Sequence, residues 1–242
     1  MDSQNTNLKA FFRTPNHASL HAAQALRYQV YCHEANFLNP DDYPDGIERD
    51  RYDEHSCHFV VTRSVGGDVV ATMRLVLPEC DTFPLDEHCT LIPEKLIGIP
   101  REKLAEISRL AMSKKHRRDP THYDRRRDRR KSSEDAGNSF DANLIFELYR
   151  LMYQQSKRAG IEYWLAAMGR PLERLLSRCS LKFTQIGPEV DYYGPVIPYL
   201  GVIADIEKHL ARANPRLFSH MLQGLEAEYI PTCATPILID AA

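Results

Sequence analysis

Apolar and polar positions follow two periods along the chain, and the period of each segment predicts its secondary structure. Residues 18–33 repeat apolar side chains at helical spacing, with Leu26 and Val30 one turn apart on one face. A neighbouring face carries Arg27 and Tyr31, and Glu34 continues this face just beyond the segment. We therefore expect an N-terminal amphipathic helix with a polar edge.

Two strand-like segments follow, residues 57–63 and 69–77, and Gly66, Gly67 and Asp68 lie between them. Small turn residues between two alternating apolar runs are typical of a β-hairpin. In an extended 69–77 segment, Arg74 lies on the face opposite the most apolar one. We expect an antiparallel hairpin in which Arg74 points away from the most apolar side.

A third strand-like segment, residues 104–113, carries Glu106, Ser108 and Arg109 on an apolar background. A buried carboxylate, hydroxyl and guanidinium are costly unless they are paired, so they indicate a functional role. In an unbroken strand Glu106 and Ser108 share a face and Arg109 points to the other. The three side chains can meet at one site only through a bulge or across a strand edge.

The rest of the chain alternates helices and strands. Asn138 or Ser139 is predicted to cap an amphipathic helix that runs to Arg158, with Gly160 as its stop. The further predicted elements are strands at 161–168, 182–186 and 196–204, and helices at 171–179, 205–212 and 216–228. This order predicts an α+β fold with a mixed sheet. We expect one domain over residues 1–204, with a basic insert at 114–138, and a C-terminal helical extension at 205–242.

Length and composition fit one large globular domain, since the chain has 242 residues, of which 43% are hydrophobic and 26% charged. The six cysteines are scattered without a CxxC pair, which favours reduced thiols over a disulfide framework or a zinc site. No apolar run approaches the ~20 residues of a membrane span, and residues 1–14 lack the layout of a signal peptide. We expect a cytoplasmic protein without a membrane span or a metal site.

The net charge of -2 conceals a polarised layout. Residues 114–131 carry ten Lys or Arg against three Asp, a local charge of +7, so the rest of the chain sums to -9. Arginine-rich stretches can bind nucleic acid, but here the remainder is acidic and Tyr123 is the only aromatic residue of the basic stretch. Nucleic-acid binding is therefore disfavoured.

Several of these residues occur in an order that points to one family. The ordered set lies between Leu26 and Ala111 and comprises Arg27-x-x-x-Tyr31, Phe37, Glu48-x-Asp50-x-x-Asp53, Arg74 and Glu106-x-Ser108-Arg109. With this set the chain resembles the GNAT-type N-acyltransferases, in the branch of the acyl-homoserine-lactone synthases and the long-chain N-acyl amino acid synthases. The later Ile186-Gly187-Pro188 and Tyr193-Gly194-Pro195 resemble the PEP-CTERM/exosortase-associated acyltransferases of that branch in particular.

The resemblance implies a GNAT-like (acyl-CoA N-acyltransferase) fold, a central mixed, mostly antiparallel sheet flanked by helices. It also implies an enzyme that moves a long-chain fatty acyl group from acyl carrier protein or acyl-CoA to the amine of a small substrate such as an amino acid. The implied site residues are Glu106, Ser108 and Arg109 for catalysis, Arg27, Tyr31, Phe37, Asp50, Asp53 and Arg74 for the substrate pocket, and Leu110, Ala111 and Met112 for the acyl thioester. Glu106 is the candidate general base, directly or through a water, because apolar neighbours raise the pKa of a carboxylate. No permanently bound cofactor is expected.

The acyl donor remains open between acyl-CoA and acyl carrier protein. Common acetyltransferases bind the CoA pyrophosphate on a glycine-rich loop, whereas residues 114–138 contain only Gly137 and many arginines. A basic surface suits the strongly acidic carrier protein, and Arg125, Arg126 and Arg127 are its predicted contacts. The alternative is a solvated insert without a partner.

Three other functions stay open. An acyl-homoserine-lactone synthase would use S-adenosylmethionine as the amine substrate, and a small-acyl GNAT enzyme would use acetyl-CoA. A noncatalytic binding module would keep the fold without an open groove beside Leu110. Independently of function, Arg27, Asp50, Asp53, Arg74 and Arg109 could form a buried ion-pair network that only fixes the first helix and its loop.

Overall fold

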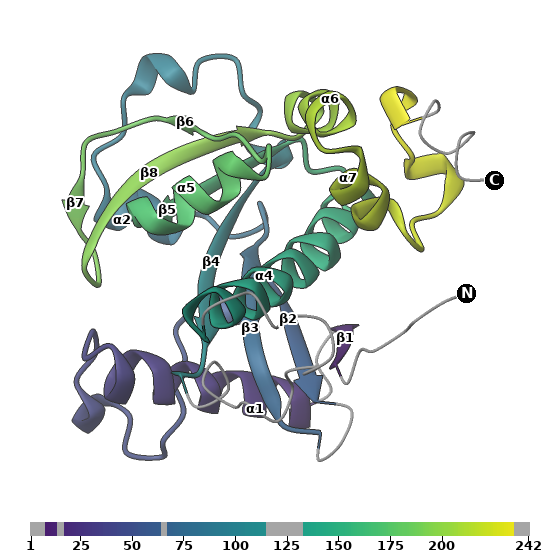
Figure 1. The fold of residues 1–242 in the computed structure, drawn as a ribbon. Coiled ribbons are helices and arrows are strands. Elements are labelled where there is room, and N and C mark those ends of the chain that lie inside the picture. Colours follow the sequence, from purple (N-terminus) through teal and green to yellow (C-terminus); the bar gives the residue numbers. More distant parts are fainter. Residues whose placement is uncertain (1–7, 14–16, 64–66, 115–132, 235–242) are drawn as a thin grey trace, which may run out of the picture. The chain divides into compact units, whose positions relative to one another are not determined.

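The computed structural model describes residues 8–13, 17–63, 67–114 and 133–234 (Figure 1). The chain divides into two compact units, each built from separate stretches of sequence. The first unit comprises Met1–Asp50, His58–Met73 and Arg109–Leu151, and the second comprises Arg51–Cys57, Arg74–Ser108 and Met152–Ala242.

Strands and helices alternate along the described residues. The strands are β1 (Leu8–Arg13), β2 (Ser56–Arg63), β3 (Val69–Val76), β4 (Leu104–Met112), β5 (Tyr163–Met168), β6 (Thr184–Gln185), β7 (Val190–Asp191) and β8 (Pro195–Val202). The helices are α1 (His17–Tyr28), the π-helix η1 (Gln29–Glu34), α2 (Pro84–His88), α4 (Ser133–Arg158), α5 (Arg170–Arg178), α6 (Ile203–Ala213) and α7 (Pro215–Leu222). Short 3-10 helices lie at Pro40–Asp42, Asp53–His55, Pro93–Lys95, Arg101–Lys103, Ala227–Tyr229 and Thr232–Ala234.

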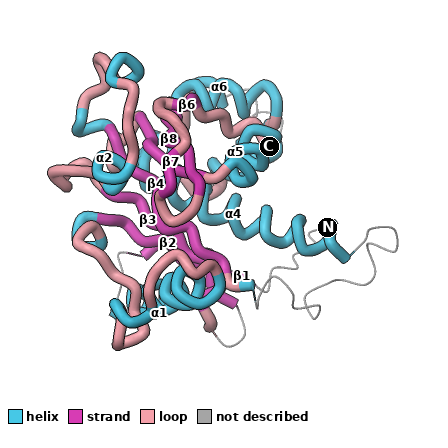
Figure 2. Tube along the Cα trace, turned by 90° about the vertical axis from the view of Figure 1, so that its left-hand side faces the viewer, coloured by secondary structure: helices cyan, strands magenta, loops and turns pink. Residues whose placement is uncertain are grey.

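In the first unit the strand order is β1-β2-β3-β4, and β1 pairs antiparallel with β2 from Leu8 opposite Arg63 to Arg13 opposite His58. Figures 1 and 2 both show α1 beside β2 and β3. Leu26 and Val30 pack there with Ala111 of β4. The predicted apolar stripe of the first helix therefore forms a small core of this unit.

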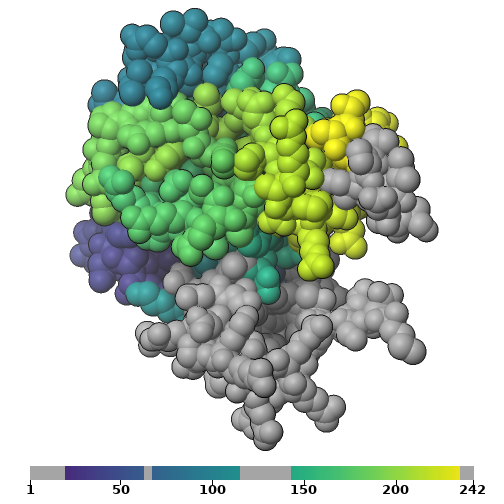
Figure 3. Space-filling view, turned by 45° about the horizontal axis from the view of Figure 1, so that its top comes forward, coloured from purple at the N-terminus to yellow at the C-terminus, as the bar shows by residue number. Residues whose placement is uncertain are grey.

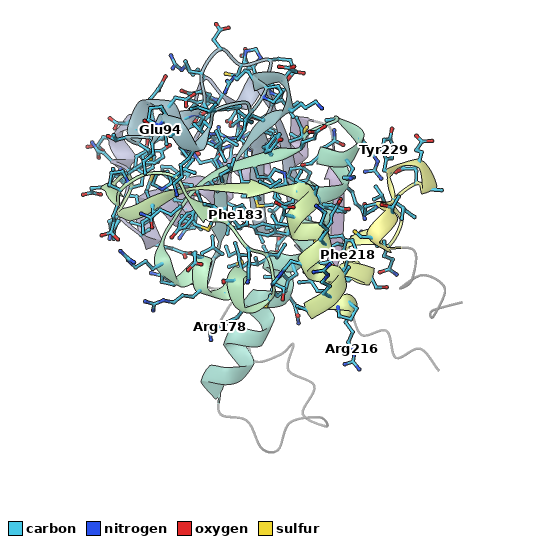
Figure 4. All side chains as sticks on the ribbon, turned by 90° about the horizontal axis from the view of Figure 1, so that it is seen from above. Glu94, Arg178, Phe183, Arg216, Phe218 and Tyr229 are labelled. Atoms are coloured by element: carbon cyan, nitrogen blue, oxygen red, sulfur yellow. The ribbon has the colours of Figure 1, made fainter. Side chains whose placement is uncertain are left out.

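In the second unit β5 pairs parallel with β4 and antiparallel with β8, which also pairs with β6 and β7. Figure 1 shows α5 crossing in front of β5 and β8, and α6 lies beside α7. Phe183, labelled in Figure 4, stacks on Trp164 of β5 with ring centroids 6.3 Å apart. The predicted α+β class, with a mixed and mostly antiparallel sheet flanked by helices, is confirmed.

The long connection between β3 and β4 packs on the second unit's sheet, and Figure 3 shows it forming one surface with the segment that holds β6 to β8. The N–H of Ile92 donates to the carbonyl of Ile186 at 2.8 Å. A Cβ atom at Gly187 would stand 2.2 Å from the carbonyl oxygen of Thr90, so only glycine allows this approach. Within this connection α2, which the sequence pattern did not predict, begins with Pro84 in its first turn.

Several boundaries differ from the predictions because long-range packing decides where an element begins and ends. The long helix begins at Ser133, so the predicted cap at Asn138 or Ser139 is wrong. The predicted helix at 18–33 is α-helical only to Tyr28 and continues as η1. The predicted strand at 182–186 is reduced to Thr184–Gln185, and α7 ends at Leu222. Residues 115–132 of the predicted basic insert lie outside the described residues.

Among the described residues, no helix combines the length and the apolar character that crossing a bilayer requires.

Candidate active site

The first unit holds a network of four charged side chains, Arg27, Glu48, Asp50 and Arg109, which we call the Glu48 cluster. The Nε of Arg27 donates to Oε2 of Glu48, and the Nε of Arg109 donates to Oε1 of the same carboxylate at 3.1 Å. The Nη2 of Arg109 donates to Oδ2 of Asp50 at 2.7 Å. Two guanidiniums and two carboxylates balance in charge, which allows Arg27 and Glu48 to be buried.

The backbone of β4 is distorted where this cluster meets the strand. Its parallel ladder with β5 runs from Leu104 to Ile107 and ends there, and Arg109 adopts a positive φ of 53°. A left-handed conformation costs a residue with a Cβ about 1–2 kcal/mol, and it re-aims the side chain as a bulge does. Residues Ser108 to Leu110 are only half-buried in an otherwise buried strand. The sequence alone required such a distortion if Arg109 was to leave the face that an unbroken strand assigns to it.

Tyr31 of η1 contacts this distorted segment. Its hydroxyl donates to the carbonyl of Leu110 at 3.0 Å, and the guanidinium of Arg109 stands 5.9 Å from the centroid of its ring. Phe37 stacks on Tyr31 at a centroid distance of 6.4 Å and is 44% exposed. The first unit thus brings Arg27, Tyr31, Phe37, Asp50 and Arg109 into one connected group.

The second unit holds a smaller group, Asp53, Arg74 and Ser108, which we call the Arg74 cluster. The Nη1 of Arg74 donates to Oδ1 of Asp53 at 2.6 Å, and its Nε donates to Oγ of Ser108 at 3.0 Å. Tyr52 packs its ring 5.8 Å from the guanidinium carbon. Arg74 is fully buried, because both faces of β3 are covered. Alternation along this strand therefore does not separate a buried face from an exposed one.

Glu106, the predicted base, is 1% exposed, and its Oε2 accepts a hydrogen bond from the N–H of Leu85 at 2.8 Å. Leu85 lies in the first turn of α2, where backbone donors favour a negative charge. Burial, together with the charges of Glu106 and Asp86, raises the pKa of the Cys89 thiol to about 11. At neutral pH Cys89 is thus a protonated thiol and a poor nucleophile.

The predicted site residues therefore divide between two groups. Of the suggested ion-pair network, Arg27, Asp50 and Arg109 are joined in the Glu48 cluster, and Asp53 and Arg74 are joined in the Arg74 cluster. The site prediction omitted Glu48, the acid that joins Arg27 to Arg109, although its position in the Glu48-x-Asp50-x-x-Asp53 motif was a usable signal. Ala111 and Met112 are buried.

The predicted carrier-protein contacts, Arg125, Arg126 and Arg127, lie outside the described residues. Among the residues that the structure describes, no group of three His, Cys, Asp or Glu side chains could hold a metal ion.

Residues 26–123 match the model of the acetyltransferase (GNAT) domain, and this range contains every predicted catalytic and substrate-pocket residue. A search of curated protein sequences finds no match.

Solved structures share the fold at low sequence identity. FeeM, an N-acyl amino acid synthase from uncultured soil microbes, is 15% identical with a TM-score of 0.55 over 84% of this chain and 94% of its own. BjaI, a CoA-dependent acyl-homoserine lactone synthase solved with SAM and isopentyl-CoA, is 15% identical with a TM-score of 0.57 over 96% and 98%. The AHL synthase LasI is 15% identical with a TM-score of 0.54 over 81% and 89%. The chain has the GNAT fold, as the resemblance implied.

Proposed function

We propose that this protein is an acyltransferase that moves a long-chain fatty acyl group from acyl carrier protein or acyl-CoA to the amine of a small substrate, such as an amino acid. One observation carries the proposal: β4 leaves its ladder with β5 after Ile107 and turns to a positive φ at Arg109. Backbone groups that leave a ladder become available to a ligand. We place the acyl thioester along this distorted strand, at Leu110 to Met112.

The reaction joins the amine nitrogen to the thioester carbonyl carbon, and the carbon–sulfur bond breaks to release the thiol. Glu106 takes the proton that the nitrogen loses, directly or through a water, and the sulfur leaves as a thiolate that takes up a proton to become the thiol. The hydrogen bond that Oε2 accepts from the N–H of Leu85 holds this carboxylate in place.

We assign binding of the amine substrate to the side chains that surround Arg109. Asp50 is the most exposed acid of the Glu48 cluster, with 22% of its side chain accessible, and it would meet the ammonium group of an incoming substrate. Phe37 offers an exposed ring for an apolar part of that substrate. We propose that Ser108 and Arg74 set the position of the strand segment between Glu106 and Arg109.

A second candidate is an acyl-homoserine-lactone synthase that takes S-adenosylmethionine as the amine. The observation that favours it is the likeness to BjaI, whose structure was solved with SAM. The two candidates differ in product: an amino acid acceptor yields an N-acyl amino acid, and S-adenosylmethionine yields a lactone.

Mass spectrometry of lipid extracts from cells that overproduce the protein tests the proposal. We expect N-acyl amino acids with wild-type protein, and a fall by a factor of about 100 or more in purified Glu106→Gln, because loss of a general base costs this much. Glu106→Gln keeps an acceptor for the Leu85 N–H, so its melting temperature should stay close to wild type. Glu102→Gln, an exposed change of the same charge, is the matched control and should leave turnover unchanged.

Acyl-homoserine lactones in these extracts would select the second candidate instead. Near-normal turnover in Glu106→Gln would remove Glu106 from the role of base. Extracts without any acylated amine, together with an inactive purified protein, would favour a noncatalytic binding module.

A further inference from the structure

The carboxylate of Glu34 accepts hydrogen bonds from two consecutive residues that follow β4. The hydroxyl of Ser113 donates to Oε1 at 3.0 Å, and the backbone N–H of Lys114 donates to Oε2 at 2.8 Å. The ammonium of Lys114 donates to the backbone carbonyl of Glu34 at 2.8 Å. Each carboxylate oxygen of Glu34 therefore has its own hydrogen-bond donor. One of the two donor residues, Lys114, also carries a positive charge.

These donors are of the kind that binds phosphate. Phosphate oxygens accept hydrogen bonds from backbone N–H groups and hydroxyls that follow a strand, and a lysine ammonium balances the charge. Ser113 is buried, whereas Lys114 is exposed, so the groups that bind the Glu34 carboxylate lie at the protein surface. Glu34 reaches them from the end of η1, 79 residues away from Ser113 along the chain.

We propose that Ser113 and Lys114 form an anion site that the protein fills with the carboxylate of Glu34, and that Glu34 thereby disfavours CoA as an acyl donor. This inference rests on the proposed function, because Ser113 and Lys114 directly follow the Leu110 to Met112 segment that we assign to the thioester. An acyl donor bound there brings the phosphate end of its pantetheine arm towards the Ser113 hydroxyl and the Lys114 N–H. Glu34 already occupies both of these hydrogen-bonding groups.

The two candidate donors meet this obstacle differently. CoA carries a pyrophosphate and a ribose phosphate, whereas the arm of a carrier protein ends in a phosphodiester with a single negative charge. Repulsion by a fixed carboxylate grows with the charge of the ligand. Glu34 therefore penalises CoA more than a carrier protein, and its carboxylate acts as a specificity determinant for the donor.

Isothermal titration with CoA and with pantetheine, which lacks phosphate, tests the inference on the full chain at low salt. We expect Glu34→Gln to tighten CoA binding about tenfold, because a neutral amide removes the repulsion and holds the Lys114 N–H more weakly than a carboxylate does. Glu34→Ala should tighten it at least as much. Neither change should alter the affinity for pantetheine.

Asp41→Asn is the matched control, since Asp41 is exposed in the same unit and its replacement changes the net charge equally. It should leave CoA affinity within about twofold of wild type, because exposed charges are screened by solvent. Thermal melts of each variant confirm that the folded protein is titrated.

Unchanged or weaker CoA binding in folded Glu34→Gln and Glu34→Ala would overturn the inference. An equal gain for pantetheine would overturn it too, because the gain would then not depend on phosphate. The titration needs no turnover, so its result is separate from that of the proposed function, which fails if the wild-type protein transfers no acyl group from any donor.

Discussion

Two buried arginines, Arg27 and Arg74, are stabilised in different ways. In the Glu48 cluster a single carboxylate accepts hydrogen bonds from two guanidiniums. In the Arg74 cluster one guanidinium donates to a carboxylate and to the neutral hydroxyl of Ser108. The first arrangement concentrates two positive charges on one acid, and the second spreads one positive charge over two acceptors. The clusters should therefore respond unequally to the loss of one acid.

Glu48→Gln should have the largest effect on stability. The substitution removes the charge that two guanidiniums share, and a buried pair that loses one partner destabilises a protein by about 3–5 kcal/mol. Urea denaturation measures this change in the free energy of unfolding. A loss below about 1 kcal/mol would show that Asp50 and solvent compensate for Glu48, and the contrast between the clusters would disappear.

Asp53→Asn should cost less, about 2–3 kcal/mol, because the hydroxyl of Ser108 and an amide oxygen still accept from Arg74. The same urea titration provides the measurement. The double variant Asp53→Asn/Ser108→Ala sharpens the comparison, since it removes the negative charge of Asp53 and the hydroxyl of Ser108, and it should approach the loss in Glu48→Gln. Equal losses in the single and double variants would mean that the Ser108 hydroxyl contributes nothing.

Tyr31→Phe should cost about 1 kcal/mol, the usual contribution of a hydrogen bond, because it leaves the carbonyl of Leu110 without the phenol donor. Since this hydrogen bond holds the distorted part of β4, we also expect the rate of acyl transfer to fall by more than the loss of folded protein would explain. Steady-state kinetics beside a urea titration separates the two effects. Full activity in Tyr31→Phe would show that the distortion does not depend on this contact.

Asp45→Asn should have the smallest effect, below about 0.5 kcal/mol. Asp45 pairs with Arg49 at 2.8 Å, but 63% of the Arg49 side chain and 44% of the Asp45 side chain are exposed, and such pairs contribute little. The substitution makes the same change of charge as Asp53→Asn and serves as its surface control. A loss as large as that of Asp53→Asn would indicate that charge alone, and not burial, sets the order.

Local patterns predicted much of the fold. The apolar stripe of α1, the hairpin of β2 and β3, the strand β4 and the Pro171 start of α5 follow from periodicity and turn residues over short windows. β1 was missed because a strand gains stability from its partner, and its partner β2 begins more than 40 residues later in the chain. The sequence did contain a local signal for α2, namely Pro84 at the first helical position and Asp86 two residues later. In the structure the N–H of Phe83 donates to the Asp86 carboxylate.

The sequence predicted which residues form the candidate site better than it predicted which of their side chains contact one another. Arg27, Asp50 and Arg109 were named together, and the structure joins them, but the acid that joins Arg27 to Arg109 is Glu48. The choice among several acids in one loop depends on side-chain geometry within a fraction of a hydrogen-bond length. Sequence spacing has no access to geometry at that scale.

The sequence by itself determined which residues carry charge into apolar segments, and in what order they follow one another. It thereby determined the fold class. It also predicted that either β4 is distorted or Glu106 and Arg109 act at different sites. Only the tertiary structure decided how: Arg109 takes a positive φ and turns to Glu48 and Asp50, whereas Ser108 accepts from Arg74 and Glu106 from the N–H of Leu85. The physical reason is distance along the chain. These partners are 21 to 61 residues apart, so their pairing depends on packing and strand register, which no local period encodes.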